Sequence, residues 1–181
     1  SNHLFLRLIL AWACAAAFTA PRTAHGFGGS AKPGRTTERK PPVLQTGDLV
    51  FQTTRGRLAT VIMVASKSKF THVGFVVRTK RGASVLEANG PVKRTPLRRF
   101  IARGVGGRVV IKRLKGGLSA KQKSALVRAG RRHLGVRYDA RFMWSDKRMY
   151  CSEFVWKAYQ RGLRLSLVEP QLMGELYSAH N

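Results

Sequence analysis

Two apolar segments joined by a tight turn impose the strongest constraint on the fold of this chain. The segments are "THVGFVVR" (71–78) and "ASVLEA" (83–88), and a Lys-Arg-Gly turn connects them. Short β-branched runs on either side of a glycine-containing turn are typical of a β-hairpin, whose two strands are antiparallel. We therefore expect the domain to be built on an antiparallel sheet.

The rest of the chain mixes strands with short helices. Ser119 and Gln122 have the spacing of a helix capping box, and Gly135 is a candidate stop for the same helix. The order of strands and short helices, followed by two helices at the end, predicts an α+β domain. The patterns predict strands over 47–52 and 108–114, and helices over 57–66, 95–104, 119–135 and from within 148–162.

The first 42 residues differ in composition from the rest. Residues 1–20 contain one Arg followed by an apolar stretch that includes Cys14 and ends in small residues, which is the profile of a secretory signal peptide. Residues 21–42 are rich in Gly, Pro and charge and are typical of a flexible linker. We expect the folded domain to occupy 43–181, in a periplasmic or secreted protein with no transmembrane span in its mature form.

The chain is strongly basic. It has 34 Lys and Arg against 8 Asp and Glu, a net charge of +26. Such a surface attracts anions of several kinds, including nucleic acid, acidic lipid headgroups and acidic cell-wall polymer. No RNA-binding aromatic motif, zinc-finger spacing or basic zipper accompanies the charge, so we expect an anionic envelope component rather than nucleic acid as partner. Charge alone leaves open a catalytically idle basic module that binds an anionic polymer.

The alternation of side chains on the hairpin isolates two polar residues. His72 shares a strand face with Gly74 and Val76, and Glu87 shares one with Val85 on the next strand. A histidine in such surroundings is either a satisfied core residue or a positioned base. A carboxylate in an apolar strand needs a partner, because burying it alone is costly. His72 is the obvious partner for Glu87, although one of the many arginines is the alternative.

Cys151 begins the last predicted helix. Val155 and Ala158 follow it at i+4 and i+7, so the thiol lies on the inward stripe of that helix. In the first turn, unpaired backbone N–H groups and the helix dipole favour a thiolate. The alternative is an inert buried cysteine. Cys151 with His72 and Glu87 would form the nucleophile, base and orienting acid of acyl-transfer enzymes.

Other polar residues have weaker assignments. Tyr138 and Tyr150 are the nearest aromatic hydroxyls to Cys151 in sequence and are candidates for an oxyanion donor or for lining the substrate cleft, with packing as the alternative. We expect Asp139 and Asp146 to cap turns, and His133 to be solvated on a basic helix. The histidines and the cysteine show no metal-ligand spacing, so the sequence predicts neither a metal site nor a cofactor.

Several of these segments together resemble a known family. The blocks "TGDLVFQ", "THVGFVV", "VLEANGPVKRTPLRRFI", "HLGVRYDARFMWSD" and "YCSEFVWKAY" are similar, in the same order, to those of the YiiX/YaeF-like proteins, circularly permuted relatives of the NlpC-type papain-like amidases. The resemblance covers about 43–161. It implies a papain-like α+β fold, in which a central antiparallel sheet packs against the helix that carries the nucleophilic cysteine.

The resemblance also implies an activity. The family's base maps to His72, its orienting acid to Glu87 and its nucleophile to Cys151. It implies a cysteine hydrolase that cleaves an amide bond, in a peptide or a cell-wall-derived substrate, through a thioester in the bacterial envelope. A thioester-forming acyltransferase or lipid hydrolase acting on envelope lipids is the alternative.

Overall fold

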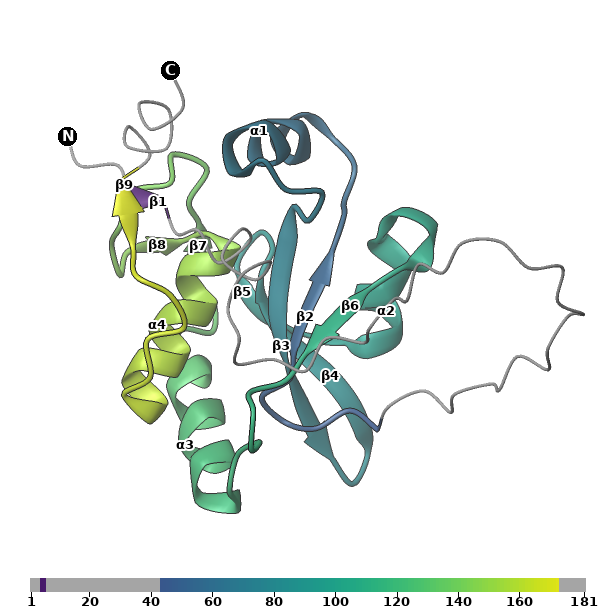
Figure 1. The fold of residues 1–181 in the computed structure, drawn as a ribbon, viewed down its shortest axis with the longest axis vertical. Helices are drawn as coiled ribbons and strands as arrows, with labels where there is room; N and C mark the ends of the chain where they lie inside the picture. The colour runs from purple at the N-terminus through teal and green to yellow at the C-terminus, as the bar shows by residue number, and fades with distance from the viewer. Residues whose placement is uncertain (1–3, 6–42, 173–181) are drawn as a thin grey trace, which may run out of the picture.

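The computed structural model describes residues 4–5 and 43–172, and its centre is a five-stranded antiparallel sheet in the order β5-β4-β3-β2-β6 (Figure 1). The predicted hairpin is confirmed as β3-β4, with Phe75 opposite Leu86 and Val76 opposite Val85. The strands of this sheet are β2 (Leu49–Gln52), β3 (His72–Thr79), β4 (Gly82–Ala88), β5 (Val92–Pro96) and β6 (Val110–Lys112).

Helices cover both faces of the sheet. Figure 1 shows α3 and α4 side by side against one face and α2 against the other, with α1 beyond one end of the strands. Among the described residues, no helix is long and apolar enough to cross a membrane. The helices are α1 (Arg57–Ser66), α2 (Leu97–Arg103), the short 3-10 helix η3 (Val105–Gly107), α3 (Ala120–Arg131) and α4 (Cys151–Leu163).

Two short strand pairs lie outside the main sheet. β7 (Arg137–Tyr138) pairs in parallel with β8 (Arg148–Met149), just before α4. β1 (Leu4–Phe5) pairs with β9 (Gln171–Leu172). The sequence predicted none of these two-residue strands, because they are too short to show a periodic pattern.

The predicted alternation of side chains on the hairpin is confirmed. Val73, Phe75 and Val77 belong to a core that includes α4, whereas Val76 and Val85 pack with Phe100 of α2 in a second core. The sheet is therefore apolar on both faces, because helices cover each of them. The predicted α+β class, with the sheet packed against the helix that begins at Cys151, is correct.

Some predicted boundaries are wrong. The segment 92–96 forms strand β5, which the sequence did not predict because its "VKRTP" lacks apolar alternation. The helix expected over 95–104 consequently starts at Leu97. The capping box at Ser119 is confirmed, but α3 ends at Arg131, four residues before Gly135. The predicted leader and linker fall on residues 1–42, which apart from 4–5 lie outside the described residues.

Candidate active site

Cys151 is the first residue of α4 and its side chain is almost fully buried, at 2% exposure. The predicted inward stripe is confirmed, because Val155 and Ala158 lie with Cys151 in the core between α4 and the sheet. An apolar stripe packed against β3 fixes the rotation of the helix about its axis. The thiol therefore faces the sheet at the end of α4 where the backbone N–H groups are unpaired.

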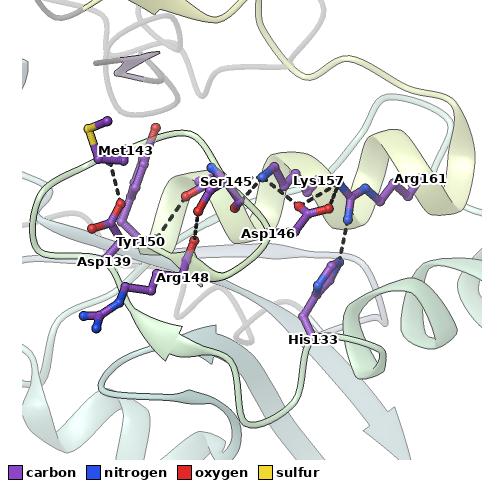
Figure 2. A network of polar contacts seen from close by, with 10 residues as sticks. His133, Asp139, Met143, Ser145, Asp146, Arg148, Tyr150, Lys157 and Arg161 are labelled. Carbon is purple, nitrogen blue, oxygen red and sulfur yellow. Dashed lines mark hydrogen bonds and ion pairs between the residues drawn. The ribbon is translucent and has the colours of Figure 1, made fainter. Parts of the chain in front are cut away.

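A buried acidic residue holds the start of α4 to the preceding loop, whose Ser145 and Asp146 are labelled beside Lys157 of α4 in Figure 2. Glu153, which is fully buried, accepts hydrogen bonds from the backbone N–H of Ser145 (3.0 Å) and of Tyr150 (3.3 Å). Lys157, one turn later, donates to the same carboxylate at 2.7 Å and to Asp146 at 2.9 Å. This network fixes the helix start, and so the position of Cys151, relative to the loop before it.

Of the three polar residues with weaker predictions, Asp139 is found as predicted and Asp146 and His133 are not; Figure 2 labels all three. Asp139 caps a turn as predicted, by accepting from the backbone N–H of Arg141 and Met143. Asp146 instead pairs with Lys157 and Arg161.

His133 is not solvated: it is 8% exposed and packs edge-on against Phe154, because α3 and α4 lie against each other. Burial first, and then the charge of Arg161, lower the pKa of His133.

His72 and Glu87 form a buried pair, and an arginine also binds the carboxylate of Glu87. The Nε2 atom of His72 lies 2.5 Å from Oε2 of Glu87. Arg103, at the end of α2, donates to both carboxylate oxygens of Glu87, at 2.8 and 2.6 Å. The two partners that the sequence offered as alternatives for Glu87 are therefore both present. A fully buried carboxylate with these two partners is compensated, which removes the cost of burying it alone.

Gly74 makes room for this pair. A Cβ atom at Gly74 would lie 2.5 Å from a methyl carbon of Val85, 2.8 Å from the carbonyl oxygen of Leu86 and 3.2 Å from Cβ of Glu87. Any larger residue would push β4 and the Glu87 side chain away from β3. The glycine in "THVGFVV" thus has a local reason, which is the close approach of the β4 segment from Val85 to Glu87 to the strand that carries His72.

The pKa values of the pair move in opposite directions. Burial alone would lower the pKa of His72, but hydrogen bonds and charge from Cys151 and Glu87 raise it to about 9. Burial would raise the pKa of Glu87, but His72, Arg103 and Thr95 together lower it to about 2. At neutral pH the pair is therefore an imidazolium and a carboxylate, the charge state that stabilises a neighbouring thiolate.

Cys151 is within hydrogen-bonding reach of both His72 and Tyr138. Because Nε2 of His72 is used by Glu87, its Nδ1 is the nitrogen left for the thiol. Burial, with the charges of Cys151 and Asp139, raises the pKa of Tyr138 above its ordinary value. The Tyr138 hydroxyl thus keeps its proton and can donate a hydrogen bond next to the sulfur.

A cavity of about 700 Å³ opens beside this group. His72 and Tyr138 line it, and both contact Cys151. Tyr150 is not among its lining residues: it is 1% exposed and packs against Phe142, with ring centroids 5.3 Å apart. Leu58, Ala59 and Ile62 of α1 give the cavity an apolar wall. Its polar lining includes Arg55, Asn89 and Arg103.

The sequence did not single out two residues of this site. Arg103 is one of 34 basic residues, and only the folded position of α2 brings it to Glu87. Gln52 lies opposite His72 on β2 and is 1% exposed, and neither polar atom of its amide has a hydrogen-bond partner among the described residues. A glutamine at the end of the apolar strand "GDLVFQ" was a visible signal, but only the strand register relates it to His72.

Comparison with known proteins decides the family. The model of the permuted papain-like amidases, YaeF/YiiX or C92 family, matches residues 43–181. The chain belongs to this family. It is 44% identical to the uncharacterised protein YiiX of Escherichia coli K12 over 131 residues, which is 72% of this chain and 65% of YiiX. The predicted family and the papain-like fold are thereby confirmed.

A solved structure supports the same assignment. The crystal structure of metalloprotein yiiX from Escherichia coli O157:H7 matches with a TM-score of 0.69 and 44% identity, covering 71% of each chain. In the described part of the present chain, no group of three His, Cys, Asp or Glu side chains could hold a metal ion, so the residues there do not fit such a site.

Proposed function

We propose that this chain is a cysteine hydrolase that cleaves amide bonds of a peptide or cell-wall-derived substrate in the bacterial envelope. The observation that supports it most is the contact of Cys151 with His72, which is itself bonded to Glu87 at the wall of the cavity. Membership of a papain-like amidase family supports the same class of chemistry. Because the chain spans 65% of YiiX, the activity is proposed for this chain from its own residues.

In the proposed reaction, the sulfur of Cys151 attacks the carbonyl carbon of the amide, and His72 holds the proton that the thiol has lost. The carbonyl π electrons move to oxygen, where the backbone N–H of Cys151 and the hydroxyl of Tyr138 donate hydrogen bonds to the oxyanion. His72 then returns the proton to the leaving nitrogen as the C–N bond breaks. Water hydrolyses the thioester, with His72 taking and returning a proton, and the free thiol and a carboxylic acid result.

The envelope setting and the anionic partner rest on weaker support. The net charge of +26 favours an anionic polymer or surface, and the composition of residues 1–42 favours export. Expression of the full chain in a bacterium, with N-terminal sequencing of the exported product, tests this part. A mature N-terminus near Phe18, or a few residues later in the Pro/Gly-rich linker, is expected, whereas active uncleaved chain in the cytosol would overturn it.

One observation favours a second activity. The apolar wall formed by Leu58, Ala59 and Ile62 suits an acyl chain, which supports a thioester-forming acyltransferase or lipid hydrolase as the alternative. Both activities pass through an acyl group on Cys151. A catalytically idle module that binds an anionic polymer would need neither the buried His72–Glu87 pair nor a thiol next to it.

An acyl-enzyme experiment separates these candidates. Purified full chain is incubated with a thiol-reactive acyl probe and with cell-wall peptide amides or phospholipids, and the mass of any adduct on Cys151 is measured. A peptide-derived acyl adduct supports the amidase, and a fatty-acyl adduct supports the alternative. His72→Ala should slow labelling by iodoacetamide at neutral pH, while His133→Ala, a buried histidine outside the pair, should not. An unreactive thiol in the wild type would rule out both enzymatic proposals.

A further inference from the structure

Helix α1 turns an apolar face to solvent. Its buried face packs through Ile62 and Ala65 against Phe142 and Tyr150. The side turned to solvent carries Val61 and Val64 together with Arg57 and Thr60, and Leu58 and Met63 lie at the edges of the buried stripe. Most of the exposed side chains of the helix are therefore apolar, which the packing of the core does not require. An exposed apolar patch of this kind marks an interaction surface rather than ordinary surface composition. Four apolar side chains of α1 are between 39% and 63% exposed: Leu58, Val61, Met63 and Val64.

The surroundings of this face are cationic. No Asp or Glu occurs between Asp48 and Glu87 in the sequence. Four basic residues flank the helix, two at its start and two after its end, and all are exposed. In interfacial binding, apolar side chains enter the boundary of the acyl chains while Lys and Arg contact anionic headgroups. The four flanking residues are Arg55, Arg57, Lys67 and Lys69.

We propose that α1 docks the protein on an anionic lipid surface. The complementarity of charge argues for this occupant, because a face flanked by four cations with no nearby anion in sequence matches acidic headgroups. Nucleic acid would use the cations but would leave Val61 and Val64 exposed to water. The proposal does not depend on the chemistry of Cys151, so it stands or falls separately from the proposed hydrolase activity.

Docking through α1 has a consequence for the cavity beside the thiol. Leu58 is partly exposed and also lines the cavity, and Ala59, Ile62 and His72 line the same cavity. A protein bound through this face places the Leu58 edge of the cavity at the level of the headgroups, with α1 itself between the lipid and the rest of the cavity. The surface and the cavity are thus two sides of the same helix.

Vesicle binding by the full chain tests the proposal. We expect co-sedimentation with vesicles that contain about 30% anionic lipid, and much weaker binding to zwitterionic vesicles or at high salt. Val61→Asp combined with Val64→Asp should weaken binding by about tenfold or more, because two apolar contacts are lost and two anions are added. Val43→Asp combined with Leu134→Asp is the matched control, since both are exposed apolar residues outside α1 (67% and 45%) and the change adds the same two anions. It should bind as the wild type does.

A second pair of variants tests the charge. Arg57→Gln with Lys67→Gln should weaken binding to anionic vesicles by roughly tenfold, because each cation near the headgroups contributes separately. Lys80→Gln with Arg81→Gln removes the same charge from the β3-β4 turn, at the other end of the sheet in Figure 1, and should change binding much less. Equal losses in the two pairs would show that net charge, and not α1, determines binding, and would overturn the proposal.

A local measurement covers the remaining outcomes. Hydrogen exchange should slow in peptides from 57–66 when anionic vesicles are added, and should not change in the β3-β4 turn. Val61→Ser with Val64→Ser replaces the Asp pair if that variant does not fold, as judged by circular dichroism. Binding that leaves 57–66 unprotected would overturn the proposal. So would a concentration-dependent dimer abolished by the Val61 and Val64 variants without any vesicle binding, because a second copy would then cover α1.

Discussion

Glu87 and Glu153 are the same residue type at the same burial, yet they differ in what surrounds them. Both are fully buried, and both pair with a basic side chain. Glu87 contacts His72 and Arg103, and both of these line the cavity next to Cys151. Glu153 contacts Lys157 and two backbone N–H groups, and it fastens the start of α4 to its loop.

The comparison shows that burial alone does not set the charge of a carboxyl group. Burial raises the pKa of both residues in the first place. For Glu87, the bonds from His72, Arg103 and Thr95 exceed that effect and lower its pKa to about 2. For Glu153, the bonds from Lys157 and the backbone do not, and its pKa stays raised. We therefore propose that Glu87 acts in the chemistry and that Glu153 stabilises α4.

The nucleophile gives the largest expected effect. Cys151→Ala removes the atom that would be acylated, so turnover should fall by about 10⁴-fold or more, to the level that binding and the oxyanion donors alone support. The melting temperature should change by a few degrees at most, since the substitution removes one small buried atom. Turnover and thermal unfolding of the same preparation check this. Activity retained in the variant would exclude Cys151 as the nucleophile.

Glu87→Gln should lower activity while the fold survives. The amide keeps the shape and one hydrogen bond but removes the charge that stabilises the imidazolium of His72. Turnover should fall by about 10²- to 10⁴-fold, less than for Cys151→Ala, because nucleophile and base remain. Activity per folded molecule and melting temperature are measured together. A large drop in melting temperature with unchanged activity per folded molecule would exclude Glu87 from the mechanism.

Glu153→Gln should have the opposite profile. It leaves Lys157, which is 3% exposed, with Asp146 and a backbone carbonyl as its remaining partners. Breaking a buried pair on one side is destabilising, by up to about 3–5 kcal/mol in the free energy of unfolding. Activity per folded molecule at low temperature should stay within about tenfold of the wild type, since no catalytic contact is removed. If activity falls as far as in Glu87→Gln without loss of stability, the division between the two glutamates is wrong.

The two glutamates should also give opposite pH dependence of stability. The raised pKa of His72, about 9, contributes stability that is complete below about 6.5 and is lost as the pH rises through 9. The lowered pKa of Glu87, about 2, contributes stability that is complete above about 4.5 and is lost as the pH falls through 2. The raised pKa of Glu153 has the opposite effect to the lowered pKa of Glu87. The contribution of Glu153 to stability decreases as the pH rises above the ordinary pKa of a glutamate, because its buried carboxyl group then ionises.

Urea unfolding at about pH 5.5 and about pH 9 measures this dependence. The wild type should lose stability between the two values, and His72→Gln should lose less, because the titrating group is gone. Glu153→Gln should retain the alkaline loss. A wild type with equal stability at both pH values would contradict the raised pKa of His72.

Much of the fold and site follows from local sequence, for reasons visible in single residues. Alternation along 71–78 and 83–88 sets the faces of the hairpin, and the stripe from Cys151 sets the inward face of α4. What depends on tertiary position could not be predicted. Arg103 reaches Glu87 only because α2 covers the sheet, and His133 is buried only because α3 and α4 meet.

The smallest effect is expected for Arg103. This arginine binds Glu87, and no arginine binds Glu153 among the hydrogen bonds of the described residues. Arg103→Gln leaves Glu87 bonded to His72 but removes a partly exposed cation, with 32% of its side chain accessible. Stability should change by about 1 kcal/mol or less, since solvent screens the pair.

Without the cation, the pKa of Glu87 should rise towards its ordinary value, and the pKa of His72 should rise further above its ordinary value. The acid limb of the activity profile should therefore move to higher pH by roughly one unit or less, and the alkaline limb should move the same way. Arg113→Gln, which removes the ion pair of Arg113 with Asp48 away from the cavity, is the matched control and should leave both limbs in place. A purely structural Arg103 would lower the amount of folded enzyme without moving either limb, and the pH profile separates that role from one that sets the charge of the His72–Glu87 pair.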